Sequence, residues 1–227
     1  MQPYFLPYIG YFQLIAAVDL FVIYDNIQYT KKGWINRNRF LENGRDAVFT
    51  LPLRGASDSL DIRDRTISEE FDRIGLLNRI RQGYRRAPFF EPAFAFFERV
   101  VLHSERNLFG FLQHSLLETC GVLGIGTKIV VSSELTIDHG LRGESKVIAT
   151  CRHVGASVYI NPSGGVDLYS RETFAEHGID LKFLRPVEIR YRQLGDDFVP
   201  WLSILDVMMF NSVDEIRGLL TNGFELE

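Results

Sequence analysis

The chain has 227 residues, of which 46% are hydrophobic and 24% are charged, and its formal net charge is -4 at pH 7. This composition is typical of a folded globular protein, and the length is sufficient for one large domain with a full core. The acidic balance argues against a nucleic-acid backbone as the main partner, because proteins that bind one present a basic surface. Local groups of basic residues still permit a small phosphate-bearing ligand.

Several further classes of protein are excluded by what the sequence lacks. No apolar run reaches the roughly 18 residues of a membrane span, and no signal peptide is visible, so we expect a cytoplasmic protein. Cys120 and Cys151 have no disulfide or metal-site spacing, and we expect buried free thiols on helices. No HExxH, CxxC or cluster of histidine and cysteine occurs, so no metal site is predicted and no cofactor can be named.

The first third of the chain opens with MQPYFLPYIGYF and continues into a predicted short helix, FQLIAAV. LFVIYDN is an apolar run that ends in an aspartate and predicts a buried strand. INRNRFL and DAVFTLPL flank the turn signal ENGR and predict a β-hairpin. The opening has the form of a loop that leads from a strand into a helix, yet no strand precedes it. We expect that the strand is supplied elsewhere or that the true start lies upstream of Met1.

The middle of the chain, residues 67–124, is predicted to be all helical. Ser68 can cap a helix through EEFDRIGLLNRIRQGY, which the prolines of the following APFFEP stretch then break. AFAFFERVVLH and LFGFLQHSLLETCGVL predict two more helices, of which the second ends at Gly121 or Gly124.

The last third alternates between predicted strands (KIVVSS, SVYIN, DLKFLRP) and predicted helices (GESKVIATCRHVG, LYSRETFAEHG). Such alternation favours parallel strands joined by right-handed crossovers. Ser212 and Gly223 could start and stop a final helix. We therefore predict an α/β fold with a mostly parallel sheet, flanking helices, an N-terminal β-hairpin and a helical insertion in the middle. The whole chain, 1–227, is expected to be one domain, with 67–124 as an insertion or subdomain.

A polar cluster follows the first predicted strand. Asp25 ends that strand, where its carboxylate can face a cleft and accept a proton. Because side chains alternate along a strand, Asn36 and Asn38 are expected to share one face with Trp34, while Arg37 points to the opposite face. An indole beside paired amides can hold a sugar or a base. A polar hairpin with an aromatic anchor is the structural alternative.

Two further loops carry candidate residues. His139 lies between a strand and a helix, where Asp138 could fix its tautomer for general-base catalysis and Arg142 could bind an anion. A solvated loop histidine is the alternative. In the opening loop, Gln2 and Tyr4 could reach a ligand from a strand end, or the loop could simply pack.

The NPSGG stretch, 161–165, follows a predicted strand. Gly164 and Gly165 could let backbone N–H groups approach a phosphate, although the glycine spacing is neither a Walker nor a Rossmann fingerprint. Plain turn geometry is the alternative. Asn161 and Tyr169 bracket this loop and could complete a pocket.

Near the carboxyl end, Tyr191 and Gln193 alternate and share one face if that segment is extended. Ser203 and Asp206 are three residues apart, so they lie on one helical face. They form either a polar pair beneath a site or a helix-capping arrangement. No G-x-S-x-G nucleophile elbow is present.

QPYFLPYIGYF, followed by VDLFVIYDNIQYTKKGWINRNRF, closely resembles the opening of the WbqC-like family. The resemblance continues through YRRAPFF, SVYINPSGGVDLY and YRQLGDDFVPWLSILDVMMFN, and so covers nearly the whole chain. Members of this family are bacterial proteins found largely among genes for O-antigen and other surface polysaccharides. They are usually described as of uncertain activity, and sometimes as transferases of a glycyl or acyl group. Members usually begin a few residues earlier with a short β-type segment, which this sequence lacks.

The residues and the resemblance together predict an enzyme of bacterial surface polysaccharide biosynthesis that transfers an acyl or aminoacyl group to a nucleotide-activated sugar or glycan precursor. Asp25 or His139 would accept a proton, while amides hold the sugar, an indole stacks on it and nearby cations offset phosphate charge. The predicted binding residues are Gln2, Tyr4, Gln28, Lys32, Trp34, Asn36, Arg37, Asn38, Arg142, Asn161, Gly164, Gly165, Tyr169, Tyr191 and Gln193. The site is expected where the opening loop, the hairpin and the 161–169 loop meet. The alternatives are a non-catalytic protein that binds sugar nucleotides and a nucleotide-handling enzyme.

Overall fold

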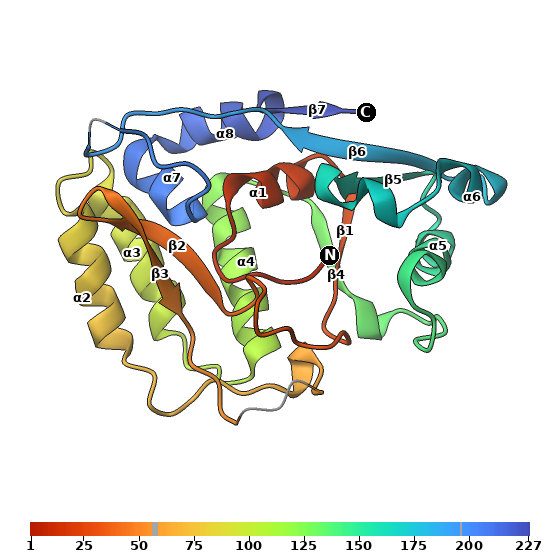
Figure 1. Cartoon of the computed structure of the whole chain (residues 1–227), viewed down its shortest axis with the longest axis horizontal. Coiled ribbons are helices and arrows are strands. Elements are labelled where there is room, and N and C mark those ends of the chain that lie inside the picture. Colours follow the sequence, from red (N-terminus) through yellow and green to blue (C-terminus); the bar gives the residue numbers. More distant parts are fainter. Residues whose placement is uncertain (56–58, 196) are drawn as a thin grey trace.

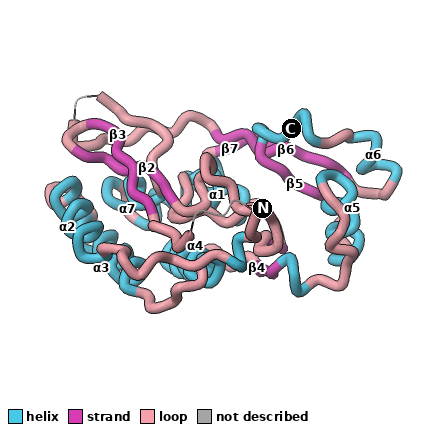
Figure 2. The backbone as a smooth tube through the Cα atoms, turned by 60° about the horizontal axis from the view of Figure 1, so that its bottom comes forward, coloured by secondary structure: helices cyan, strands magenta, loops and turns pink. Residues whose placement is uncertain are grey.

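A computed structural model describes residues 1–55, 59–195 and 197–227 as a mixed α/β protein (Figure 1). In chain order the elements are α1 (Ile9–Ala16), β1 (Leu20–Ile23), β2 (Arg37–Glu42), β3 (Arg45–Thr50), η1 (Ile62–Asp64), α2 (Arg73–Tyr84), α3 (Phe90–Leu102), α4 (Leu108–Leu123), β4 (Lys128–Val131), η2 (Ser132–Glu134), α5 (Gly143–Val154), β5 (Val158–Pro162), η3 (Ser163–Leu168), α6 (Arg171–Glu176), β6 (Asp180–Pro186), α7 (Ile204–Phe210), α8 (Val213–Asn222) and β7 (Phe224–Leu226), where η marks a short 3-10 helix. The hairpin lies with α2 and α3 at one end of the molecule, and β5, β6, α5 and α6 lie at the other (Figures 1 and 2).

The strands of the described residues form three small sheets, so a mostly parallel sheet is not confirmed. β1 pairs with β4 in parallel, β2 with β3 antiparallel, and β6 lies between a parallel β5 and an antiparallel β7. The alternation of strands and helices indicated parallel crossovers, but it does not determine which strands become neighbours. β1 and β5 belong to different sheets, and directly after β1 the Tyr24 N–H donates to the Met1 carbonyl (2.9 Å).

In the middle region, capping residues mark the starts of α2 and α4 and the end of α4. α2 begins after Asp72, whose carboxylate accepts from the Gly75 N–H (2.8 Å), so the prediction that Ser68 caps this helix is wrong. Pro92 lies in the first turn of α3, where a missing N–H costs no helical hydrogen bond. It therefore belongs to the start of a helix and does not break one. α4 ends at Gly124, which adopts φ +73° and closes the helix as glycine readily does.

Aromatic side chains connect distant segments within the larger of two hydrophobic cores. Phe5 packs edge-on against Phe49 (ring centroids 5.3 Å apart) and lies 5.7 Å from Phe111, which joins the opening loop to the hairpin and α4. A smaller core lies among α5, α6, β5 and β6. Cys120 and Cys151 are buried free thiols on α4 and α5, as predicted. In the described part of the chain, no helix has both the length and the apolar character that crossing a membrane requires.

Candidate functional site

The carboxyl ends of β1 and β4 lie side by side and bring several polar residues together. Ile23 pairs with Val131 in the parallel register, so the residues that follow both strands emerge at the same edge. Asp25 lies there, as predicted, and its Oδ1 accepts from the Ser133 N–H (3.0 Å). Its side chain is only 5% exposed. In open α/β sheets this is the edge at which ligands bind.

Five side chains gather at this edge and are called here the strand-end cluster: Asp25, Asn26, Arg63, His139 and Lys146. The Lys146 ammonium donates to Asn26 Oδ1 (3.3 Å), so the Asn26 amide nitrogen is left to donate to His139 Nδ1 (3.0 Å). His139 Nε2 lies 3.0 Å from the carbonyl of Leu135 and must therefore carry the hydrogen. Both nitrogens of a neutral imidazole are thus engaged within the protein, which leaves neither for the predicted role of general base.

The predicted partner of His139 is wrong. Asp138 Oδ1 accepts from the Gly140 N–H (2.8 Å) in a tight local turn. Asn26, which lies far away in sequence, contacts the imidazole in its place. Aspartate beside a glycine commonly closes such a turn, and this local bond takes the carboxylate away from the ring.

Cations slightly outnumber carboxylates around the strand-end cluster. Arg63 lies 3.9 Å from both Asp25 Oδ2 and Asp61 Oδ2. Lys146 is only 8% exposed, and burial lowers the pKa of its ammonium. Asp25 and Asp61 oppose this shift, while Arg63 and Arg142 add to it. Two carboxylates therefore face three cations, which leaves room for the negative charge of a small anion such as a phosphate or carboxylate.

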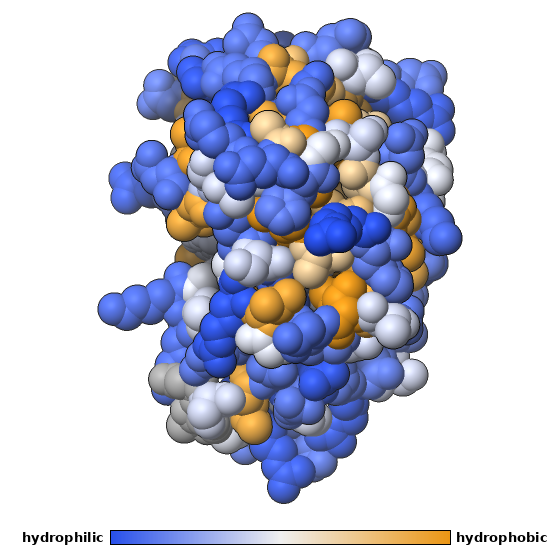
Figure 3. Space-filling view, turned by 90° about the vertical axis from the view of Figure 1, so that its right-hand side faces the viewer, coloured by the Kyte–Doolittle hydropathy of each residue, from blue (hydrophilic) through white to orange (hydrophobic). Residues whose placement is uncertain are grey.

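Tyrosines connect this edge to the end of β5. The Tyr24 ring lies 5.3 Å from the Lys146 ammonium, and burial, with Tyr169 nearby, raises the pKa of Tyr24 to about 12. The Tyr169 ring lies 5.8 Å from that of Tyr159, whose hydroxyl donates to Asn161 Oδ1 (3.2 Å). Tyr169, a predicted site residue, therefore lies near Tyr24 beside the strand-end cluster, and Asn161, a second one, is linked to Tyr169 only through Tyr159. Figure 3, which faces the end of the molecule with α5 and α6, shows a largely hydrophilic surface with smaller apolar areas.

The glycine pair after β5, Gly164 and Gly165, lies in a short turn beside Asn161. A Cβ added at Gly165 would lie 2.2 Å from Asn161 Nδ2, so the Asn161 side chain would have to shift to accommodate any other residue. Gly164 is exposed and faces open space. Both residues lie in η3, so the turn itself accounts for them. Arg142 precedes α5 and is exposed.

The paired amides of the hairpin are directed into the protein. Asn36 Oδ1 accepts from the Tyr29 hydroxyl (2.9 Å), and its amide nitrogen donates to the Leu51 carbonyl (2.7 Å). Asn38 donates to the Leu6 carbonyl (2.9 Å). Both amides are buried, so they hold the hairpin against neighbouring loops. As predicted, they face the same way, with Asn36 directly before β2 and Asn38 on it.

Trp34 does not share that face, which corrects the predicted sugar platform. Trp34 is 40% exposed, and its ring lies 5.6 Å from the guanidinium groups of both Arg37 and Arg39. The alternation rule fails here because β2 begins only at Arg37, and Trp34 lies in the turn before it. Arg37 also donates to the Lys32 carbonyl (2.8 Å) and so ties this turn to the strand. Lys32 itself is exposed.

The remaining predicted residues fall into two groups. Gln28 is exposed, and its main chain pairs with Asp61 beside the strand-end cluster. Tyr4 and Gln2 are partly buried in the opening loop, and the Tyr4 hydroxyl lies 3.4 Å from Gln2 Oε1. Tyr191 and Gln193 lie elsewhere and are described below. Figures 1 and 2 show β2 well apart from β5, so the opening loop, the hairpin and the 161–169 loop do not meet in one site.

Sequence reasoning missed Lys146, Arg63 and Asn26 as members of the site. Lys146 offered a signal, because it stands on the buried stripe of α5 with Val147 and Thr150, where a lysine requires an explanation. Arg63 and Asn26 offered none. The described residues contain no group of three or more His, Cys, Asp or Glu side chains arranged to hold a metal ion.

Comparison with known proteins agrees with the resemblance noted in the sequence. The family model described as the WbqC-like protein family matches residues 2–218. The uncharacterized protein Rv1507c of Mycobacterium tuberculosis is 28% identical over 214 residues, which span 93% of this chain and 91% of that protein. No solved structure gives a significant match. Since the match extends over almost the entire sequence, the chain belongs to the WbqC-like protein family.

Proposed function

We propose that this protein transfers an acyl or aminoacyl group onto a phosphate-bearing sugar precursor of bacterial surface polysaccharide, and that it does so at the strand-end cluster. The observation that carries the proposal is the placement of Lys146. This lysine is buried at the carboxyl edge of β1 and β4, held by Asn26, and accompanied by Arg63 and Arg142. Burying an ammonium costs free energy, and that cost is offset if the group serves a bound anion. Membership of the WbqC-like family suggests the pathway.

The geometry divides the roles as follows. Arg63 and Arg142 are exposed enough to contact a phosphate, with Lys146 behind them. Asp25 would accept the proton of the attacking hydroxyl or amine, since its Oδ2 has only a long contact, 3.9 Å, with Arg63. As the new ester or amide bond forms, the leaving group of an activated donor departs and takes up this proton. Lys146 would orient Asn26, whose amide in turn orients His139.

A non-catalytic protein that binds sugar nucleotides remains the second candidate. One specific observation favours it: Asp25 and His139, the two predicted proton acceptors, are both engaged in hydrogen bonds with the protein. The two candidates predict the same ligand contacts and differ only in turnover.

Binding is tested first, by thermal unfolding with a panel of nucleotide sugars, acyl-CoA species and nucleoside triphosphates. A ligand at 100 times its Kd stabilises the native state by about 2.7 kcal/mol, which is readily measured. We expect a nucleotide sugar to raise the Tm of the wild-type protein. We expect a much smaller increase in the Tm of the Arg142→Gln variant. Arg152→Gln is the matched control, because Arg152 is an exposed arginine at the other end of the same helix. If Arg142→Gln and Arg152→Gln respond alike, the anion does not bind at this edge.

Catalysis is tested second, with Asp25→Asn at ligand saturation in a reconstituted pathway. General-base catalysis typically contributes about 10²–10⁴-fold, so we expect turnover to fall by that factor while the ligand-induced Tm shift persists. Turnover that survives the substitution would assign the protein to the binding class. A nucleotide-handling activity is separated from both by mass spectrometry, because it would consume a nucleoside triphosphate during incubation.

A further inference from the structure

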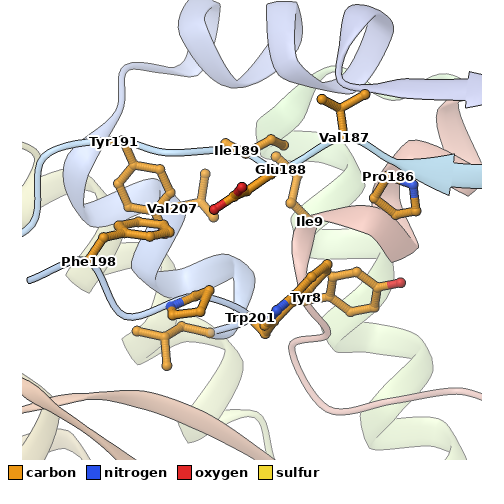
Figure 4. A pocket seen from close by; sticks show the side chains of 12 residues that line it. Tyr8, Ile9, Pro186, Val187, Glu188, Ile189, Tyr191, Phe198, Trp201 and Val207 are labelled. Atoms are coloured by element: carbon orange, nitrogen blue, oxygen red, sulfur yellow. The ribbon is translucent and has the colours of Figure 1, made fainter.

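A hollow of about 290 Å³ lies away from the strand-end cluster, where the start of α1, the segment after β6 and the start of α7 meet (Figure 4). Its walls are mostly aliphatic, aromatic or proline side chains, and Glu188 is its charged residue. The rings of Tyr8, Tyr191, Phe198 and Trp201 surround it, and it is called here the aromatic hollow. This volume is at the lower end of the range for small-ligand pockets.

Trp201 has an unfavourable backbone conformation, and its indole is exposed to solvent. Its side chain is 57% exposed, although a large apolar ring gains free energy by burial. Its φ is +60°, in the left-handed region that bulky residues rarely adopt. The Trp201 carbonyl accepts from Arg39 Nη2 (3.0 Å), and the indole meets the Tyr8 ring edge-to-face at 5.9 Å. A strained, exposed and fixed indole at the rim of a hollow points to a ligand.

Residues outside the hollow also fix the position of Tyr8. A Cβ added at Gly10 would lie 2.3 Å from the Tyr8 ring, so the ring rests over a bare glycine. Two residues earlier, Leu6 has φ +43°. Its carbonyl accepts from Asn38 Nδ2 (2.9 Å) and from the Ser203 hydroxyl (2.7 Å). These two buried polar groups therefore fix the loop that carries Tyr8.

Tyr191 is anchored from below by a buried carboxylate. Its hydroxyl donates to Asp206 Oδ2 (2.6 Å), to which Gln193 Nε2 also donates (2.8 Å). Gln193 in turn bonds both the N–H and the carbonyl of Val199 (2.8 and 3.1 Å), which closes this loop, and Phe198 packs edge-on against Tyr191 at 5.2 Å. The aromatic walls are thus built by the fold before any ligand arrives.

Glu188 defines the chemistry that the hollow can accept. Figure 4 shows its carboxylate directed toward the centre of the hollow, between Tyr191 and the pair Tyr8 and Trp201. Arg190 occupies Oε1, at 2.8 Å from its Nε, and Oε2 has no hydrogen-bond partner among the described residues. Both side chains are largely exposed, 64% for Glu188 and 71% for Arg190, so water screens their charges and the carboxylate supplies chiefly an acceptor oxygen at the hollow.

We infer that the aromatic hollow binds an uncharged saccharide ring. The C–H face of a sugar would stack on the Trp201 indole, and neighbouring hydroxyls would donate to Glu188 Oε2. Aromatic rings with one acceptor group suit a ligand whose one face is apolar and whose edge is polar. This inference goes beyond the proposed function and does not depend on it, because the two sites share no residue.

The test is saturation-transfer NMR on the full chain with three neutral probes: methyl β-glucoside, methyl β-galactoside and N-acetylglucosamine. We expect transfer to at least one sugar, and an apparent affinity lowered about tenfold or more by Trp201→Ala, the loss expected for one ring contact in a desolvated site. Trp34→Ala is the matched control, since Trp34 is the second exposed tryptophan and lies outside the hollow. An unchanged thermal unfolding curve shows that each variant folds.

Two further measurements, a variant of Glu188 and a cationic probe, distinguish a sugar ligand from a cation. Glu188→Gln retains an acceptor oxygen and should keep sugar affinity within about threefold, whereas a cation site would lose most of its affinity. Tetramethylammonium is the cation probe. Binding of that probe without any sugar, no transfer to any of the three sugars, or equal transfer in Trp201→Ala would each overturn the inference. Arg142→Gln should leave sugar binding intact, so failure of the strand-end proposal is distinguished from failure of this one.

Discussion

Replacement of Asp206 by alanine should destabilise the protein more than any other single change around the aromatic hollow. Asp206 has no exposed surface, and its carboxylate accepts from the Tyr84 hydroxyl (2.8 Å), the Tyr191 hydroxyl (2.6 Å) and Gln193 Nε2 (2.8 Å). Alanine would leave three donors without this acceptor, two of them buried and the Tyr191 hydroxyl partly buried. Each unsatisfied donor costs about 1–3 kcal/mol, and some rehydration at the rim near Tyr191 reduces the sum, so we expect a loss of about 3–5 kcal/mol.

Urea unfolding measures this loss, and two milder variants rank the contributions. Tyr191→Phe removes one donor and should cost about 1 kcal/mol. Tyr84→Phe should cost more, because the Tyr84 hydroxyl also accepts from the Leu41 N–H (2.7 Å), which would then lose its partner. Asp214→Ala is the control, since its side chain is 91% exposed and its loss should change stability by less than about 0.5 kcal/mol. If Asp206→Ala unfolds at the same urea concentration as Tyr191→Phe, the carboxylate does not hold these three groups together.

Three further predictions concern titration and reactivity. Burial raises the pKa of Asp206 above its ordinary 3.8, so the stabilisation from its protonated form is present below that pH and is lost as pH rises through the folded value; Asp206→Asn should remove this slope in unfolding experiments. Burial raises the pKa of Cys120 to about 12 and that of Cys151 to about 11, so iodoacetamide should label neither in the native state and both in urea; rapid native labelling would contradict their burial. Nitrogen NMR at neutral pH should find the His139 hydrogen on Nε2 in the wild-type protein and a mixture of tautomers in Lys146→Met, because the lysine sets the amide that contacts the ring; identical spectra would refute that control.

Local capping signals predicted helix ends well where nothing distant competed with them. The expected start of the last helix at Ser212 is observed, reinforced by Glu215 in a reciprocal capping box. Ser68 carried a comparable signal and failed. Its N–H donates to the Pro52 carbonyl (2.7 Å), and the preceding Ile67 bridges to Leu53. This contact with the segment after the hairpin holds the chain extended for a few residues, and the helix starts at the next available cap.

The direction of a polar side chain was harder to predict than its secondary structure. The shared face of Asn36 and Asn38 followed from strand alternation, but alternation cannot distinguish a face that meets a ligand from one that meets the protein. Asn38 bonds to Leu6, 32 residues earlier, and Asn36 bonds to Leu51 across the hairpin. Arg63 reaches Asp25 from a 3-10 turn 38 residues away, a contact that no local pattern marks. Such pairs depend on the tertiary fold, so the sequence signalled polar segments without revealing their partners.

The polar residues of these segments act mainly by positioning other groups. Asn38 and Ser203 hold Leu6 in a conformation that it would not adopt alone, and Tyr8 and Trp201 then reach the rim of the hollow. At the other site, Lys146 orients an amide that orients an imidazole. In both places the role of a buried polar group is to fix the position of a residue that is closer to solvent. Loss of ligand binding on substitution of such a buried residue would therefore not show that it touches the ligand, and contact must be assigned from the exposed residues Trp201, Glu188, Arg63 and Arg142.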